Sequence, residues 1–171
     1  MASTALPISI CSLLVSFLSF VFSVHHWRRS FRPIVSVMVK THQAGNVSIA
    51  YDLVVLNSGT LPARNVHIAA EPASLNAALG EDASEENKQR WLAALDRTIY
   101  LLHNGDKVSC SFGTTQANDS GFWKYAATIF VTVSYEHWFR MGWFRRTFKE
   151  HQQIRIADSD SFTGHQWGEV A

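Results

Sequence analysis

The sequence predicts a mainly β protein, with one N-terminal transmembrane helix followed by a β-sandwich that carries one inserted α-helix. Three observations lead to this fold class. Residues 1–24 contain no charged side chain, and about 20 apolar residues span the ~30 Å hydrocarbon layer of a bilayer. After residue 33, six or seven short segments alternate between apolar and polar residues, as half-buried strands do. Residues 84–99 instead show apolar residues at helical spacing.

The first segment, residues 1–26, is predicted to be a retained transmembrane helix. A cleaved signal peptide is one alternative, but the segment lacks a basic start, and the sequence after it, His25-His26-Trp27, is a poor cleavage site. A buried helix of a soluble protein is the other alternative. Pro7 suits the first turn of the helix.

Residues 27–33 are predicted to be a basic juxtamembrane segment. Arg28, Arg29 and Arg32 follow the helix, whereas no Lys or Arg precedes it. The side richer in Lys and Arg tends to stay in the cytoplasm. We therefore expect a single-pass protein of the cell inner membrane, with its N-terminus outside and its domain in the cytoplasm. Trp27 suits the membrane–water interface.

Five serines in the predicted helix recur at spacings of three and four residues, which places them on one face. This helix-association seam consists of Ser9, Ser12, Ser16, Ser19 and Ser23. In lipid, small residues let two helix backbones approach closely, and their hydroxyls can bond across the interface. The seam therefore predicts a homo-oligomer or a partner transmembrane helix, with a left-handed crossing. In the alternative, each hydroxyl bonds its own helix and the helix stands alone.

The domain is expected to span residues 34–158. Residues 34–40 and 47–56 are predicted to form a hairpin across the turn 41–46, and residues 64–70 a third strand. Alternation gives the inward side chains of these strands as Val35, Val37, Val39, Val47, Ile49, Tyr51, Leu53, Val55, Val66 and Ile68.

The middle of the domain is predicted to be a loop over residues 71–83 and a helix over about 84–99. Asp82 is the expected N-cap, with Glu85 at the capping-box position. The apolar face of this helix is expected to contain Trp91, Leu92, Leu95 and Ile99.

The end of the domain is predicted to contain a short strand over 100–102 and further strands over 107–112, 124–136 and about 146–157. A loop is expected over 113–121, and a polar tail over 159–171. The inward side chains expected here are Val108, Cys110, Phe112, Tyr125, Ala127, Ile129, Val131, Val133, Tyr135, Phe148, Ile154 and Ile156.

One stretch of the domain resembles a known family of modules. It covers residues 53–68, with the sequence Leu-Val-Val-Leu-Asn-Ser-Gly-Thr-Leu-Pro-Ala-Arg-Asn-Val-His-Ile. Their pattern of a strand, Asn-x-Gly and x-x-Ala-x-x-Val resembles the stretch between the second and third strands of bacterial membrane-anchored immunoglobulin-like modules of the adhesion type. Residues 131–156 resemble the closing hairpin of these modules. The sequence departs from them in the inserted helix and in a Trp-rich turn. The resemblance implies an immunoglobulin-like sandwich that serves as a binding or spacer module.

The turn over residues 137–146 is unusual because it interleaves aromatic and basic side chains. Such a composition suits a membrane interface or a protein hot spot. In an immunoglobulin-like sandwich this turn lies at the end where the chain enters, so we expect it to face the bilayer. The alternative is that its aromatics fold back onto the sandwich. The predicted membrane-interface residues are Trp27, Arg28, Arg29, Arg32, Trp138, Phe139, Arg140, Trp143, Phe144, Arg145 and Arg146.

No sequence pattern predicts catalysis, so we expect no enzyme, no catalytic residues and no cofactor. The eight histidines show no HxxxH or HExxH spacing, and the two cysteines are too far apart in the sequence to form a metal-ligand pair. No metal site is therefore expected. The net charge of +1 gives no sign of nucleic-acid binding. The expected function is a membrane-anchored binding and assembly module, whose partners are membrane lipid, another transmembrane helix and a protein of unknown identity. The alternative is an oligomeric pore or membrane-perturbing effector built from the Ser-lined helix.

Overall fold

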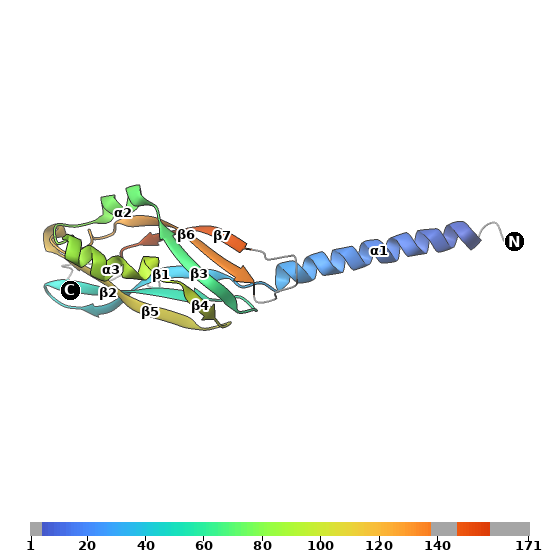
Figure 1. Ribbon diagram of the computed structural model, residues 1–171, viewed down its shortest axis with the longest axis horizontal. Coiled ribbons are helices and arrows are strands. Elements are labelled where there is room, and N and C mark those ends of the chain that lie inside the picture. Colours follow the sequence, from blue (N-terminus) through green and yellow to red (C-terminus); the bar gives the residue numbers. More distant parts are fainter. Residues whose placement is uncertain (1–4, 138–146, 158–171) are drawn as a thin grey trace, which may run out of the picture. The chain divides into compact units, whose positions relative to one another are not determined.

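The computed structural model describes residues 5–137 and 147–157. The chain forms two compact units, Met1–Arg32 and Pro33–Ala171, which are described separately. The first unit contains one helix, and the second is mainly β, with two antiparallel sheets. Figure 1 labels the helices and strands of both units.

The helix of the first unit is α1, Ala5–Ser30. Leucine, serine and aromatic residues make up most of its sequence, and Pro7 lies in its first turn, where a proline costs no internal hydrogen bond. The helix is thus a few residues longer at its C-terminal end than the predicted segment 1–26. It includes His25, His26 and Trp27 without a break.

The first sheet contains three strands in the order β1-β2-β5. These are β1 (Val35–Ala44), β2 (Ser48–Asn57) and β5 (Lys107–Gln116). The predicted hairpin of the first two strands is confirmed, with Val37 opposite Val55 and Val39 opposite Leu53. Strand β5 pairs on the other side of β2, with Val108 opposite Val55 and Cys110 opposite Leu53.

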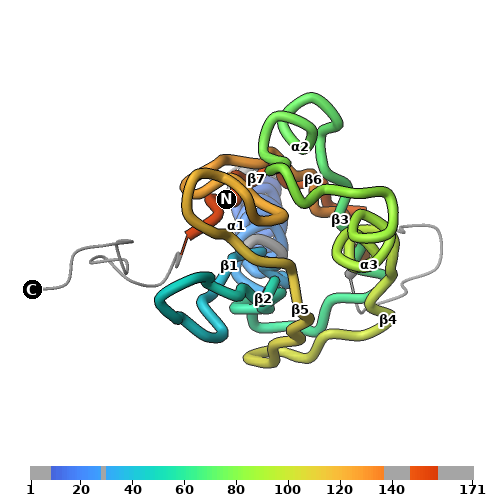
Figure 2. The backbone as a smooth tube through the Cα atoms, turned by 90° about the vertical axis from the view of Figure 1, so that its left-hand side faces the viewer, coloured from blue at the N-terminus to red at the C-terminus, as the bar shows by residue number. Residues whose placement is uncertain are grey.

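The second sheet contains four strands in the order β4-β3-β6-β7. These are β4 (Ile99–Leu102), β3 (Ala63–Ala70), β6 (Thr128–His137) and β7 (Thr147–Arg155). Figure 2 shows β3, β6 and β7 on one side of the domain and β1, β2 and β5 on the other. The inner faces of the two sheets contribute to one hydrophobic core.

The core confirms most of the alternation predicted from the sequence. Its largest fully buried side chains include Trp123, Tyr51, Tyr135, Phe112 and Phe122. The tyrosine hydroxyls are satisfied, because Tyr51 bonds Thr115 Oγ1 at 3.1 Å and Tyr135 donates to Glu150 Oε1 at 2.7 Å. The predicted inward residues that are buried are Val35, Val37, Val39, Ile49, Tyr51, Leu53, Val55, Val66, Ile68, Phe112, Ile129, Val131, Val133, Tyr135, Ile154 and Ile156.

Four predicted inward residues are exposed: Val47, Tyr125, Val108 and Cys110. Val47 precedes β2 and is 74% exposed. Tyr125 precedes β6 and is 37% exposed, because the positive φ of Ala126 turns the chain just before that strand. Val108 is 45% exposed although it lies within β5, and Cys110 of the same strand is exposed as well.

The middle of the domain contains two helices where one was predicted. Helix α2, Pro72–Ala78, lies in the predicted loop; it begins with a proline at its start, and the hydroxyl of Ser74 accepts from Phe130 N at 3.0 Å. Helix α3, Glu85–Asp96, is shorter than predicted, and its N-cap is Ser84 rather than Asp82. The Ser84 hydroxyl accepts from Asn87 N at 3.3 Å.

The predicted loop 113–121 is wrong over its first half, because β5 continues to Gln116 and a short 3₁₀ helix, η1 (Ala117–Asp119), follows. Gly113 has a φ of +91°, and its missing side chain leaves room for Phe122 and Trp123. The polar composition of residues 113–116 predicts a loop, but in the structure these residues form a strand that Phe122 and Trp123 cover.

Candidate functional site

The surface of α1 is apolar and uncovered. A stretch of 19 residues, Ser9–Trp27, is long and apolar enough to cross a membrane, and none of it is buried. Leu13 is 71% exposed and Phe22 is 73% exposed. Burying apolar surface is favourable by about 25 cal/mol per Å², so this helix gains stability wherever lipid or another helix covers it.

The predicted helix-association seam lies within one continuous helix. Because α1 runs unbroken from Ala5 to Ser30, the spacing of the five serines keeps them on one face. All five side chains, Ser9, Ser12, Ser16, Ser19 and Ser23, are exposed. Helix association through this face stays a prediction.

The described part of the predicted membrane-interface set is small. Trp27 is 53% exposed, and its ring centroid lies 5.5 Å from that of Phe31, which is 42% exposed. Phe31 was not among the predicted interface residues, although its spacing of four residues from Trp27 on a helix could have indicated it. Arg32 is exposed.

The rest of the membrane-interface set lies outside the described residues. This holds for the side chains of Arg28 and Arg29, and for the whole of Trp138, Phe139, Arg140, Trp143, Phe144, Arg145 and Arg146. The membrane contact of the turn therefore stays a prediction.

A cavity of about 310 Å³ lies between α3 and strand β5 of the second unit. We call it the α3 groove. Its walls combine aliphatic side chains, two arginines and the start of β5. The residues that line it are Leu53, Val55, Ile68, Arg90, Ala93, Ala94, Arg97, Ile99, Val108, Ser109, Cys110 and Ser111.

Helix α3 shapes one wall of this groove because its two faces differ. Leu95 is buried against the core. Arg90, Ala93, Ala94 and Arg97 follow one another at spacings of three, one and three residues, which forms a second stripe along the helix and its C-cap. The alanines leave space beside the sheet, and the arginines stand at the two ends of the stripe. The spacing of these four residues is the signal in the sequence that could have indicated the groove.

The charges at the groove are mostly basic. Arg90 lies 3.9 Å from Glu86 Oε1, and its guanidinium carbon lies 5.9 Å from the centre of the Trp91 ring. Arg97 is exposed and has no ion pair within the described residues. A guanidinium that is not neutralised favours an anionic partner.

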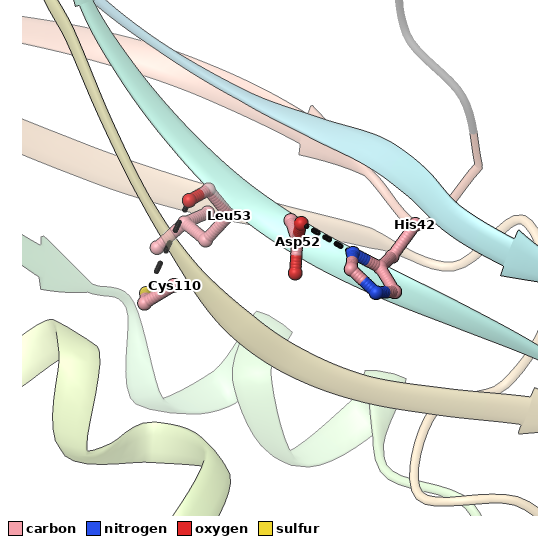
Figure 3. Close-up of polar contacts among 4 residues, drawn as sticks. All are labelled: His42, Asp52, Leu53 and Cys110. Carbon is pink, nitrogen blue, oxygen red and sulfur yellow. Dashed lines mark hydrogen bonds and ion pairs between the residues drawn. The ribbon is translucent and has the colours of Figure 1, made fainter.

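Cys110 was predicted to be a small core residue, and this is wrong. It lies on the same inward face as its neighbour Leu53, yet it is exposed, because β5 is an edge strand and α3 does not cover it. Its thiol lies 4.0 Å from Leu53 O (Figure 3). Partial desolvation raises the pKa of the Cys110 thiol; the negative charge of Asp52 adds to this rise, and Arg97 opposes it.

Asp52 itself faces away from the groove and is held by a neighbouring strand. Its Oδ2 lies 3.0 Å from Nδ1 of His42 across β1 and β2, and Figure 3 shows this pair beside Leu53 and Cys110. Among the residues that the structure describes, no group of three His, Cys, Asp or Glu side chains is placed to hold a metal ion.

One comparison with known proteins gave a match. Residues 5–159 match the family model described as "Domain of unknown function (DUF8453)", which covers most of the chain. Searches of curated proteins and of solved structures gave no match. The chain therefore belongs to the DUF8453 family.

Proposed function

We propose that this protein is a single-pass, membrane-anchored binding and assembly module. Helix α1 anchors it in a cell inner membrane, with the N-terminus outside and the two-sheet domain in the cytoplasm. The helices associate through the serine seam, and the domain recruits a protein partner at the membrane surface. The observation that carries this proposal is the uncovered apolar surface of Ser9–Trp27, with its row of serines on one face.

The strand order supports an immunoglobulin-like relationship for the domain. In an immunoglobulin constant domain, the first, second and fifth strands are neighbours in one sheet, and the third, sixth and seventh form the other. The same groups occur here as β1-β2-β5 and as β3-β6-β7. Domains of this architecture serve widely as binding and spacer modules on cell surfaces, which agrees with a recruiting role.

The assembly step is tested by the mass of the full chain in detergent micelles, measured by light scattering. The test variant carries Ser12→Leu, Ser16→Leu and Ser19→Leu. These changes keep the helix apolar but fill the seam with larger side chains, which prevents close approach of two backbones. We expect the native chain to be an oligomer and the variant to be a monomer.

A matched control places bulk on the opposite face of the same helix. Leu14, Leu18 and Val21 lie about half a turn away from the serines, so Leu14→Phe, Leu18→Phe and Val21→Phe should leave the oligomer intact. A native chain that is already monomeric would reject association through α1. Equal loss in both variants would reject the seam as the interface.

The second candidate function is an oligomeric pore or membrane-perturbing effector. The row of hydroxyls supports it, because five or more helices could line a polar pathway with them. The seam carries no charged residue to select ions, so we rank this function lower. The measured number of chains separates the two, since a dimer cannot enclose a pore.

A further inference from the structure

The edge of β5 that faces away from β2 is covered along its second half and uncovered along its first half. Over the second half, Trp123 covers the strand: its backbone N donates to Thr114 O at 2.9 Å, and its indole N–H donates to Phe112 O. Over the first half, Lys107–Ser111, β2 is the one strand neighbour among the described residues. All five residues of this half are exposed. An edge that offers free N–H and C=O groups is a template for another strand.

In the part of the chain that the structure describes, the first half of the β5 edge lacks the neighbouring strand that an immunoglobulin constant domain has at this position. In the immunoglobulin constant order, the fourth strand pairs with the fifth. In this chain the fourth strand, β4, pairs with β3 in the other sheet, with Val66 opposite Ile99. The α3 groove lies there instead, and its lining includes four consecutive residues of β5, from Val108 to Ser111.

We propose that the first half of the β5 edge binds an extended acidic peptide of a partner protein as an added strand. The peptide backbone pairs with Lys107–Ser111, and its inward side chains enter the α3 groove. The inference rests on the proposed function as a recruiting module, and it names the class of partner and the surface that holds it. Strand addition of this kind draws affinity from main-chain hydrogen bonds and specificity from pockets for alternate side chains.

The groove specifies the side chains of such a peptide. Its floor is aliphatic, formed by Leu53, Val55 and Ile68, so it accepts an aliphatic side chain. Arg90 and Arg97 also line it, so they favour an acidic side chain at the next inward position. Inward side chains of a strand are two residues apart. The expected motif is therefore Val, Ile or Leu, then any residue, then Asp or Glu.

Charge argues against a second copy of this chain as the occupant. The sequence 107–111, Lys-Val-Ser-Cys-Ser, contains no acidic residue that could face the two arginines. Pairing two β5 edges would also bring Lys107 and the arginines of both copies together, and like charges across paired strands are destabilising. An acidic strand of another protein meets neither obstacle.

The test is a selection of random seven-residue peptides displayed on phage, with the full chain in detergent micelles as the target. We expect enrichment of the motif above. The charge-reversed variant Arg90→Glu with Arg97→Glu should select Lys or Arg in place of the acidic residue. It should also bind the peptide selected on the native chain about tenfold more weakly, a change of about 1.4 kcal/mol.

The location of the bound peptide is measured by the reactivity of Cys110. In a Cys11→Ser background, the selected peptide should slow alkylation of Cys110 by N-ethylmaleimide and protect the amides of Lys107–Ser111 from hydrogen exchange. Cys110→Trp fills the groove at an exposed position and should abolish binding. The matched control, Lys149→Trp, puts the same side chain on an exposed site of β7 and should leave binding unchanged.

The proposal would be overturned by the absence of an enriched motif, by a motif unchanged by charge reversal, or by a peptide that binds the Cys110→Trp variant as tightly as the native chain. Protection of Cys110 by decanoate in the absence of any peptide binding would likewise overturn it, and would assign the groove to a small amphiphile. None of these outcomes depends on the mass of the micellar particle. Failure of the helix seam and failure of the peptide site are therefore distinguishable.

Discussion

Asn57 Nδ2 donates to the backbone O of Leu102 at 3.1 Å, and this bond ties the end of β2 in one sheet to the end of β4 in the other. The same nitrogen donates to Leu61 O at 2.8 Å. Oδ1 accepts from Gly59 N at 3.0 Å and from Ile34 N at 3.2 Å. Asn57 is fully buried, so these four bonds satisfy its amide at a place that water does not reach.

Replacing Asn57 with Ala should lower the free energy of unfolding by about 3 kcal/mol. The change leaves buried backbone groups without partners, and each such group costs about 1–3 kcal/mol. The measurement is chemical denaturation of the full chain followed by circular dichroism. Asn76→Ala, at an exposed site of α2, is the control and should change stability by less than about 0.5 kcal/mol. Equal effects of the two changes would contradict the role of Asn57.

Gln152 of β7 should be needed to protect the outer edge of β1. Its Oε1 accepts from Val37 N at 2.9 Å, and its Nε2 donates to Val35 O at 2.6 Å, so one side chain stands in for a neighbouring strand. Gln152→Leu removes both bonds and should cost about 2 kcal/mol. It should also speed hydrogen exchange of the Val37 amide.

The neighbouring Gln153 gives the control for this prediction. It is exposed and makes neither bond, so Gln153→Leu should leave both the stability and the Val37 exchange rate near their native values. Unchanged exchange at Val37 in the Gln152 variant would show that another group protects this edge.

The strands were predictable because their signal is local. Val35, Val37 and Val39 recur at every second position, and each of them is buried. A period of two residues needs no knowledge of the neighbouring strand. The same holds for α3, where Leu95 lies at helical spacing from Trp91 and Leu92.

The errors in the prediction come from contacts between distant segments. Helix α2 has only seven residues and a single large aliphatic side chain, Leu75, and it is held by the bond between Ser74 and Phe130 of β6. Cys110 has the alternation of a core residue, but its exposure depends on which strand lies beyond β5. The groove arises because α3 leaves space beside that edge. Sequence periodicity contains no information about which elements become neighbours.

Substitutions at Gly113 and Gly105 can be compared to distinguish the cost of backbone strain from the cost of steric overlap. Both have positive φ, +91° and +77°. A Cβ at Gly113 would lie 2.9 Å from Trp123 Nε1, whereas a Cβ at Gly105 would have no atom within 4 Å. Gly105→Ala should cost about 1 kcal/mol, from the left-handed backbone alone. Gly113→Ala should cost about 3 kcal/mol, because overpacking a filled core is added.

The measurement for this pair is thermal unfolding of the two variants beside the native chain. The larger fall in melting temperature should belong to Gly113→Ala, with a loss of near-ultraviolet circular dichroism as the ring of Trp123 is displaced. If both variants lost the same stability, the packing of Trp123 against Gly113 would not contribute.

The last prediction concerns the pH at which Cys110 reacts. The thiolate is the reactive form, and desolvation raises the pKa of this thiol. The rate of alkylation by iodoacetamide should therefore rise at a higher pH than for an ordinary exposed cysteine. The measurement is the pH–rate profile of the full chain with Cys11→Ser, so that one thiol is followed.

Two charge changes should move this profile in opposite directions. Asp52→Asn removes a negative charge that disfavours the thiolate, so the pKa falls and the profile shifts to lower pH. Arg97→Gln removes a positive charge that favours the thiolate, so the profile shifts to higher pH. Lys149→Gln, on β7, is the control and should leave the profile in place. Shifts in the reverse order would contradict the electrostatics of the groove, and a missing shift for Arg97→Gln would place its charge too far from Cys110 to attract an acidic peptide there.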